Sequence, residues 1–142
     1  MEHLNMSHTD CLAAATKLSD LLSSSLSHNA IAVYAIPRGG VSAAYLLKCV
    51  NPAIRLVDDI ERATVVIDDV YDSGQTMKRV TAERKNIGML HTATLFCKNT
   101  SHMPQFVGDF LPADKWVTFP WERALDDTHG ANDIVTRLLQ YI

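Results

Sequence analysis

The sequence predicts an α/β fold: a twisted parallel sheet flanked by helices in a doubly wound arrangement. Short apolar runs of strand length alternate with segments whose apolar residues recur every three or four positions. Two of these runs end in turns that lead directly into helices, as the strands of βαβ units do. The chain has 142 residues, of which 47% are hydrophobic. That length supports one core and hardly two, so we expect a single domain over residues 1–142.

In the first half of the chain, helices and strands alternate from the start. Apolar residues recur at helical spacing over residues 10–27, with Thr9 as a suitable cap. Residues 40–50 are apolar on almost all sides, as expected of a helix buried against a sheet. The strands expected here are the apolar runs at residues 30–36, 54–57 and 64–67.

The second half continues the same alternation. Residues 76–88 carry apolar positions at helical spacing and end on Gly88, a good helix stop. Residues 92–97 and 116–119 are the next expected strands. Residues 132–142 form an apolar stripe at helical spacing, which we expect to dock on the sheet or on a second subunit.

The composition narrows the class of protein. A net charge of -3 disfavours nucleic acid as the main partner, because phosphate backbones recruit Lys and Arg patches. No apolar stretch approaches the ~18 residues that a membrane span requires. With no signal peptide visible, Cys11, Cys49 and Cys97 are expected to be reduced, buried thiols in a cytoplasmic protein.

Residues 65–77 read VVIDDVYDSGQTM and place three acids at the end of a predicted strand. Ligands bind at the carboxyl ends of parallel strands, so Asp68 and Asp69 should lie at a binding edge. The turn that follows offers backbone N–H groups at a helix N-terminus, which is an anion site. Carboxylates beside a phosphate cradle suit a phosphorylated ribose with Mg²⁺. The alternative is an acidic strand end with a capped helix, which needs only one carboxylate.

Two other phosphate motifs are excluded by this loop. A Walker-type P-loop requires Lys after the second glycine, and no Lys follows Gly74. A dinucleotide fingerprint requires three glycines, and this loop contains one.

The stretch resembles the phosphoribosyl-pyrophosphate (PRPP) motif of type I phosphoribosyltransferases. The residues of the base pocket, described below, make the xanthine-guanine enzymes the members that the chain resembles most closely. The resemblance implies that Asp68 and Asp69 contact the ribose hydroxyls and help to organise Mg²⁺. It also implies that Asp72 handles the proton on purine N7, as in members that act on 6-oxopurines. The implied 5′-phosphate site consists of Asp72, Ser73, Gly74, Gln75 and Thr76.

A second motif, IPRGG at residues 36–40, also ends a strand and opens a helix. It resembles the pyrophosphate loop of the same family, which implies that Arg38, Gly39 and Gly40 bind pyrophosphate. An arginine beside exposed backbone amides suits an anion. By itself the motif is more typical of an ordinary Pro-Gly turn with a solvated Arg. Its position upstream of the acidic motif, in the order found in the family, favours the binding site.

The resemblance extends to a base pocket. Lys98 ends a predicted strand, and WVTFPWE at residues 116–122 follows in the order found in xanthine-guanine enzymes. It implies that Lys98 binds the purine O6, Trp116 stacks on the ring, and the backbone of Val117 faces the 2-substituent. Core packing is the alternative for Trp116 and the favoured interpretation for Trp121. Glu122 is either a ligand of a second Mg²⁺ or a solvated surface residue.

The chain departs from the family in two places. Only residues 51–63 stand where these enzymes carry a long mobile loop, so we expect a reduced hood and flexible loop. Asp58 and Asp59 in this segment are expected to form a polar turn rather than a metal site. Thr118 stands where the xanthine-guanine enzymes usually carry an acid.

The resemblance implies a purine phosphoribosyltransferase that transfers the phosphoribosyl group of PRPP to guanine, xanthine or hypoxanthine with Mg²⁺. The expected partners are PRPP, a purine base and further copies of the chain in a homodimer or higher homo-oligomer. The reduced loop leaves an alternative open: a catalytically weak or inactive PRPP- or nucleotide-binding regulator of the same fold.

Overall fold

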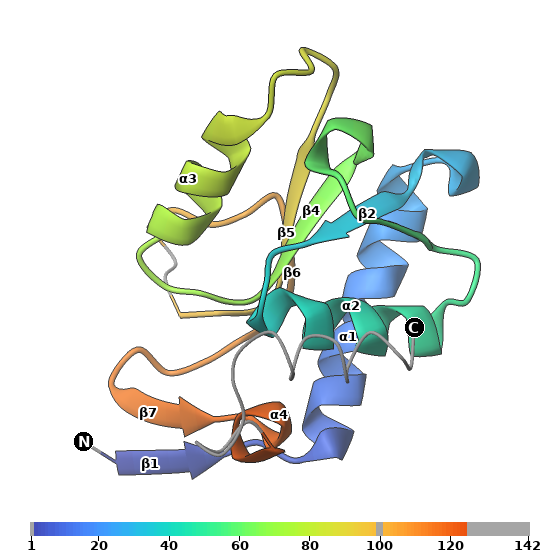
Figure 1. The fold of residues 1–142 in the computed structure, drawn as a ribbon. Coiled ribbons are helices and arrows are strands. Elements are labelled where there is room, and N and C mark those ends of the chain that lie inside the picture. The colour runs from blue at the N-terminus through green and yellow to red at the C-terminus, as the bar shows by residue number, and fades with distance from the viewer. Residues whose placement is uncertain (1, 99–100, 125–142) are drawn as a thin grey trace.

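The centre of the molecule is a five-stranded parallel sheet, described in a computed structural model that covers residues 2–98 and 101–124 (Figure 1). The strand order is β3-β2-β4-β5-β6, and every neighbouring pair is parallel. The predicted doubly wound α/β fold is therefore confirmed. The five strands are β2 (Ala32–Ala35), β3 (Arg55–Val57), β4 (Val65–Tyr71), β5 (His91–Cys97) and β6 (Phe106–Phe110).

The strand order places a topological switch point between β2 and β4. From β2 the chain crosses outward to β3, and it then returns on the other side of β2 to form β4 and continue to β5 and β6. In open α/β sheets, ligands bind in the crevice beyond the carboxyl ends of the two strands at such a point. Both predicted binding motifs follow these two strands.

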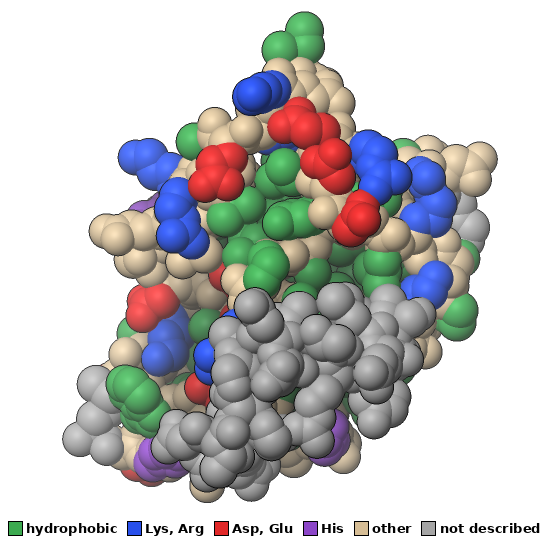
Figure 2. Space-filling model, viewed as in Figure 1, with side chains coloured by type: hydrophobic (Ala, Val, Ile, Leu, Met, Phe, Trp, Pro, Cys, Tyr) green, Lys and Arg blue, Asp and Glu red, His purple; other side chains and the backbone are tan. Residues whose placement is uncertain are grey.

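Helices cover the two faces of the sheet unequally. α1 (His8–Ser25) and α2 (Gly39–Val50) share the larger buried cluster with Val65 and Ile67 of β4. α3 (Gln75–Glu83) packs through Met77 on Val66, which points to the opposite face. Figure 2 shows apolar side chains that reach the surface on this side, framed by charged ones.

Several boundaries differ from the prediction. α1 is capped by Ser7, not Thr9: Ser7 Oγ accepts from the Asp10 backbone N–H, and Asp10 accepts from the Ser7 N–H in return. α3 ends at Glu83 and not at Gly88, because the backbone turns to an extended conformation at Arg84. β4 runs to Tyr71, so the acids lie within the strand and not after it.

A second, two-stranded parallel sheet consists of β1 (Glu2–Asn5) and β7 (Lys115–Thr118). It lies beside the carboxyl edge of the main sheet, below it in Figure 1, and is followed by α4 (Pro120–Ala124). The strand predicted at residues 116–119 is thus present but belongs to this small sheet. Neither β1 nor β6 was predicted, because EHLN is polar and FVGDF contains Gly and Asp, which are rare in strands.

The segment between β3 and β4 lies at the amino edge of the sheet, away from the predicted binding motifs. It contains a 3₁₀ turn, η2 (Ile60–Arg62), in which Asp59 accepts from Glu61 N–H and Asp58 pairs with Arg62. The predicted polar turn is therefore confirmed. The Glu61 carboxylate also accepts from the backbone N–H groups of Lys85 and Asn86, just before β5.

Other expectations have mixed outcomes. Cys11 and Cys97 are buried, whereas Cys49 is exposed, since its position falls on the outer side of α2. Among the described residues, no helix combines the length and apolar character that a bilayer crossing requires. The helix expected over residues 132–142 lies outside the described residues.

Arg84 provides a test of how firmly the amino edge is held. Its guanidinium donates to the carbonyls of Ile60, Ala63 and Gly88 at 3.1, 3.0 and 2.6 Å. Because Arg84→Ala removes all three bonds, we expect it to lower the free energy of unfolding by about 2 kcal/mol in urea titrations. Lys85→Ala keeps its backbone bond to Glu61 and should change stability by less than about 0.5 kcal/mol. Equal losses in the two variants would contradict this assignment.

Candidate active site

The two predicted motifs meet at the switch point because glycines allow β4 and the loop after β2 to touch. The Ile36 N–H donates to the Ile67 carbonyl at 2.9 Å. This hydrogen bond joins the residue that follows β2 to β4. A Cβ built at Gly39 would overlap the Asp69 carboxylate, and one at Gly40 would lie 2.6 Å from the Ile67 carbonyl oxygen. Only glycine fits there. The loop that carries Arg38 therefore lies directly against Asp69, with the Arg38 side chain exposed.

The acidic pair is held by short backbone contacts. The Asp69 N–H donates to Asp68 Oδ1 at 2.9 Å, and the Val70 N–H donates to Asp69 Oδ1 at 2.8 Å. Burial, together with the neighbouring Asp69 charge, raises the pKa of Asp68 to about 7. A cation or a set of hydroxyl donors would relieve the cost of this buried charge, so the pair suits a ligand that supplies either.

The loop after β4 turns back on itself at Gly74. Its φ of 83° is in the left-handed region, and the Tyr71 hydroxyl occupies the space that a side chain would need. The turn brings the start of α3 beside the end of β4 and leaves a cavity of about 110 Å³. Five predicted site residues line this cavity: Asp68, Asp72, Ser73, Gly74 and Thr76.

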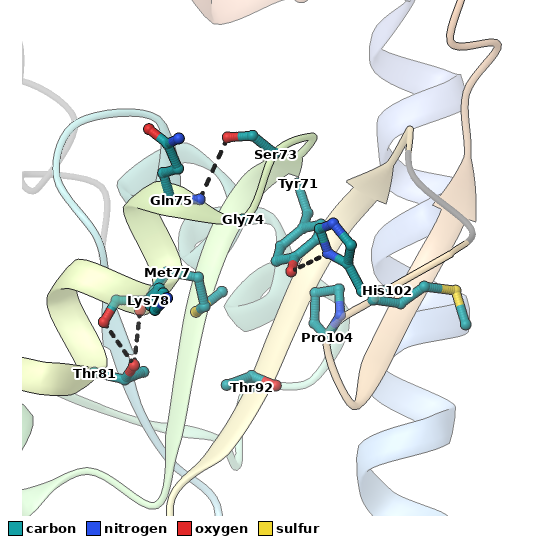
Figure 3. Close-up of a pocket in the computed structure, with 11 residues that line it drawn as sticks. Tyr71, Ser73, Gly74, Gln75, Met77, Lys78, Thr81, Thr92, His102 and Pro104 are labelled. Carbon is teal, nitrogen blue, oxygen red and sulfur yellow. Dashed lines mark hydrogen bonds between the residues drawn. The ribbon is translucent and has the colours of Figure 1, made fainter.

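A larger cavity of about 490 Å³ lies on the other side of the same loop (Figure 3). The predicted site residue Gln75 faces it, and the Gln75 backbone N–H donates to Ser73 Oγ at 3.3 Å. Tyr71 and His102 form one wall, with the Tyr71 hydroxyl 3.0 Å from His102 Nδ1. The Tyr71 side chain thus separates the two cavities and supports the turn at Gly74.

The residues predicted to bind the base belong to the small sheet and to the end of β5. Lys98 Nζ donates to the Lys115 carbonyl at 3.1 Å, which ties the end of β5 to the start of β7. Trp116 is 62% exposed, so its indole does not serve the core. Val117, on the opposite side of β7, is buried. The exposed indole offers a flat surface on which a ring could stack.

Trp121 is buried, as the sequence indicated, and it also makes a hydrogen bond that the sequence did not indicate. It is buried as expected, with 7% of its surface exposed. Its Nε1 also donates to Asp69 Oδ2 at 3.2 Å, a contact across 52 positions that no local pattern could reveal. The side chain thus connects α4, which follows β7, with the acidic pair near the end of β4.

The described residues could bind Mg²⁺ only if a substrate supplied further ligands. Glu122 is exposed and its Oε1 accepts from the Phe119 N–H at 3.0 Å, as a cap of α4. This favours the surface interpretation for Glu122. No three His, Cys, Asp or Glu side chains converge within residues 2–98 and 101–124. Mg²⁺ is commonly held by one or two carboxylates with phosphate oxygens and waters, which is what Asp68 and Asp69 offer.

The sequence and the fold were compared with those of known proteins. No family model matches the sequence. A xanthine-guanine phosphoribosyltransferase of Roseobacter denitrificans is 38% identical over 64 residues, which cover 43% of this chain and 34% of that protein. The match therefore spans about a third of the length of the curated relative.

Solved structures share the fold over most of the chain. A purine phosphoribosyltransferase of Pyrococcus horikoshii superimposes with a TM-score of 0.68 and 24% identity, covering 85% of this chain and 95% of that one. A xanthine-guanine-hypoxanthine phosphoribosyltransferase of Helicobacter pylori gives 0.67 and 18%, covering 87% and 96%. A hypothetical protein of Neisseria gonorrhoeae with bound ppGpp gives 0.65 and 19%, covering 98% and 96%. The predicted resemblance to type I phosphoribosyltransferases, and to xanthine-guanine enzymes among them, is confirmed.

The raised pKa of Asp68 predicts how stability depends on pH. The Asp68 carboxyl binds a proton more tightly in the folded chain than in the unfolded chain, where its pKa has the ordinary value of 3.8. The free energy of unfolding therefore falls as the pH rises from 3.8 to about 7. Asp68→Asn removes this ionisation. At pH 8 the variant should be more stable than the wild type by about 2 kcal/mol, and at pH 4 this advantage should vanish.

Urea titrations at the two pH values measure the difference. Asp114→Asn, at an exposed position outside the site, is the matched control and should change stability little at either pH. An Asp68→Asn variant that is less stable than the wild type at pH 8 would contradict the assignment.

Proposed function

We propose that this chain is a purine phosphoribosyltransferase that transfers the 5-phosphoribosyl group of PRPP to a 6-oxopurine and releases pyrophosphate. The observation that carries the proposal is the shared cavity at the carboxyl end of β4, where Asp68 faces the loop of residues 72–76. The Gly39–Gly40 turn lies against the same acidic pair. Sites for a phosphate, for sugar hydroxyls and for a second anion thus adjoin one another.

In this proposal, the loop holds the 5′-phosphate and the acids hold the ribose. Backbone N–H groups of residues 72–76 donate to phosphate oxygens at the start of α3, where the helix dipole favours an anion. Asp68 and Asp69 accept from the ribose hydroxyls. Mg²⁺, when bound to PRPP and these carboxylates, would neutralise charge on the pyrophosphate.

The pyrophosphate is the leaving group, and in this proposal the loop of Arg38, Gly39 and Gly40 binds it. The bond from ribose C1′ to the pyrophosphate oxygen breaks as N9 of the purine bonds to C1′. Positive charge develops on the sugar and negative charge on the pyrophosphate, so catalysis consists mostly of positioning and charge stabilisation. Arg38 supplies a fixed positive charge for the departing anion.

The base needs to lose one proton during transfer. When N9 of a 6-oxopurine bonds to C1′, the proton on N7 becomes acidic, and in this proposal it passes to Asp72. Asp72 lines the smaller cavity, beside the loop that binds the phosphate. Lys98 donates to O6, and Trp116 stacks on the ring. The backbone at Val117 faces the 2-position, where guanine, xanthine and hypoxanthine differ.

We further propose that the protein acts in the cytoplasm as a homodimer or higher homo-oligomer, as the resemblance implies. Analytical ultracentrifugation of the full chain tests the assembly. A monomer at micromolar concentration would contradict this part of the proposal without affecting the transfer reaction.

The alternative is a nucleotide-binding regulator that keeps the cradle and does not turn over. The comparisons do not favour it, because the named relatives are phosphoribosyltransferases. Calorimetry with PRPP and Mg²⁺, followed by pyrophosphate release with guanine, xanthine and hypoxanthine, separates the two functions. We expect binding and release with at least one base; binding without release would favour the regulator.

Asp72→Asn tests the proton transfer. The amide cannot accept the N7 proton but preserves the shape of the cradle, so kcat should fall by about 10²- to 10⁴-fold while the PRPP dissociation constant changes little. Steady-state kinetics and calorimetry measure the two effects. Asp20→Asn, on the exposed face of α1, is the control and should match the wild type. An unchanged kcat in Asp72→Asn would remove this residue from the mechanism.

A further inference from the structure

The orientation of Trp121 is set by the core of the main sheet. Its ring lies parallel to that of Phe119, with the centroids 4.8 Å apart and the planes 2° apart. Phe119 stacks in turn on Phe96 at 5.4 Å, and Phe96 is fully buried in β5. Three aromatic rings therefore form a continuous stack from the sheet to the turn after β7. This stack leaves the indole little freedom to rotate.

The indole N–H at the end of this stack meets the carboxylate of Asp69. Trp121 Nε1 donates to Asp69 Oδ2 at 3.2 Å, while Val70 N–H donates to Oδ1 at 2.8 Å. The backbone of Gly39 closes off another side of the same carboxylate. The side chain of Asp68 also hydrogen-bonds to Asp69, so each Asp69 oxygen accepts at least one protein hydrogen bond or shares in this contact. The carboxylate is thus fixed in direction, and because it is only half-buried, part of it remains open to a ligand.

Packing alone does not explain a tryptophan at this position. A phenylalanine could extend the aromatic stack equally well, whereas a buried indole N–H needs a hydrogen-bond partner. Here that partner is a carboxylate, and hydrogen bonds to charged acceptors are stronger than neutral ones. The N–H group therefore has a role of its own.

We propose that Trp121 is a positioning residue that holds Asp69 in the direction required to bind the ribose and its metal ion. The inference rests on the proposed function and adds a residue to it. Trp121 lies in α4, directly after the strand β7 that carries Trp116 and Val117. In the proposed function, one short segment therefore contacts the base with one indole and orients the sugar site with the other. Base and sugar sites are linked through this segment.

The test compares the same substitution at the two tryptophans. Trp121→Phe keeps the stack and removes the donor, so the dissociation constant for PRPP with Mg²⁺ should rise about tenfold, as expected for a lost hydrogen bond to a charged group. The KM for the purine should change little. Trp116→Phe should give the reverse pattern, with a higher purine KM and unchanged PRPP affinity. Calorimetry and steady-state kinetics measure these constants.

A second substitution guards against loss of folding. Incorporation of 3-benzothienylalanine at position 121 replaces the N–H with sulfur in a ring of the same shape, and it should weaken PRPP binding as much as Trp121→Phe. In an Asp69→Asn background, Trp121→Phe should cause a much smaller further loss, because the charged acceptor is already gone.

The outcomes separate this inference from the function on which it rests. A wild type that binds no PRPP would overturn both. A wild type that binds PRPP, with variants at position 121 that bind it equally well, would overturn the positioning role alone. Equal losses of PRPP and purine affinity in the benzothienylalanine protein would also overturn it, because they would indicate a general disturbance of the turn.

Discussion

The close contact between the glycine turn after β2 and the acidic end of β4 is the constraint on which the site depends. Gly39 has no side chain, and the Asp69 carboxylate occupies the space that a Cβ at this position would need. Two segments that are 30 positions apart in the sequence thereby become one surface. The parallel pairing of β2 and β4 makes this possible, because it brings both carboxyl ends to the same edge at the switch point.

The acids at this edge carry an energetic cost that the fold does not recover by itself. Asp68 lies partly buried beside a like charge, and its pKa is raised accordingly. A carboxyl in a structural ion pair has a lowered pKa, whereas the pKa of Asp68 is raised. A carboxyl whose pKa is raised in this way is typical of a site that binds a ligand. The loop of residues 72–76 in the same cavity is the part of the chain that we propose binds the phosphate of that molecule.

Much of this could be predicted from the sequence, because the informative signals were local. The apolar run before Asp68, the Gly74 turn and the helix after it follow from periodicity and glycine chemistry. β1 and β6 could not be predicted, since their residues are not typical of strands and long-range pairing holds them in place. The hydrogen bond from Trp121 to Asp69 was hidden for the same reason: its partners meet only after the chain has crossed the sheet.

The position of η2 has a consequence for the fate of the sugar. Glu61 and Arg84 fasten this segment to the edge of the sheet opposite the phosphate loop, so it cannot swing across the reacting centre. In the proposed reaction, this segment therefore does not shield the activated ribose from water. Protection of the sugar against hydrolysis to ribose 5-phosphate would have to come from the bound base or from another part of the chain.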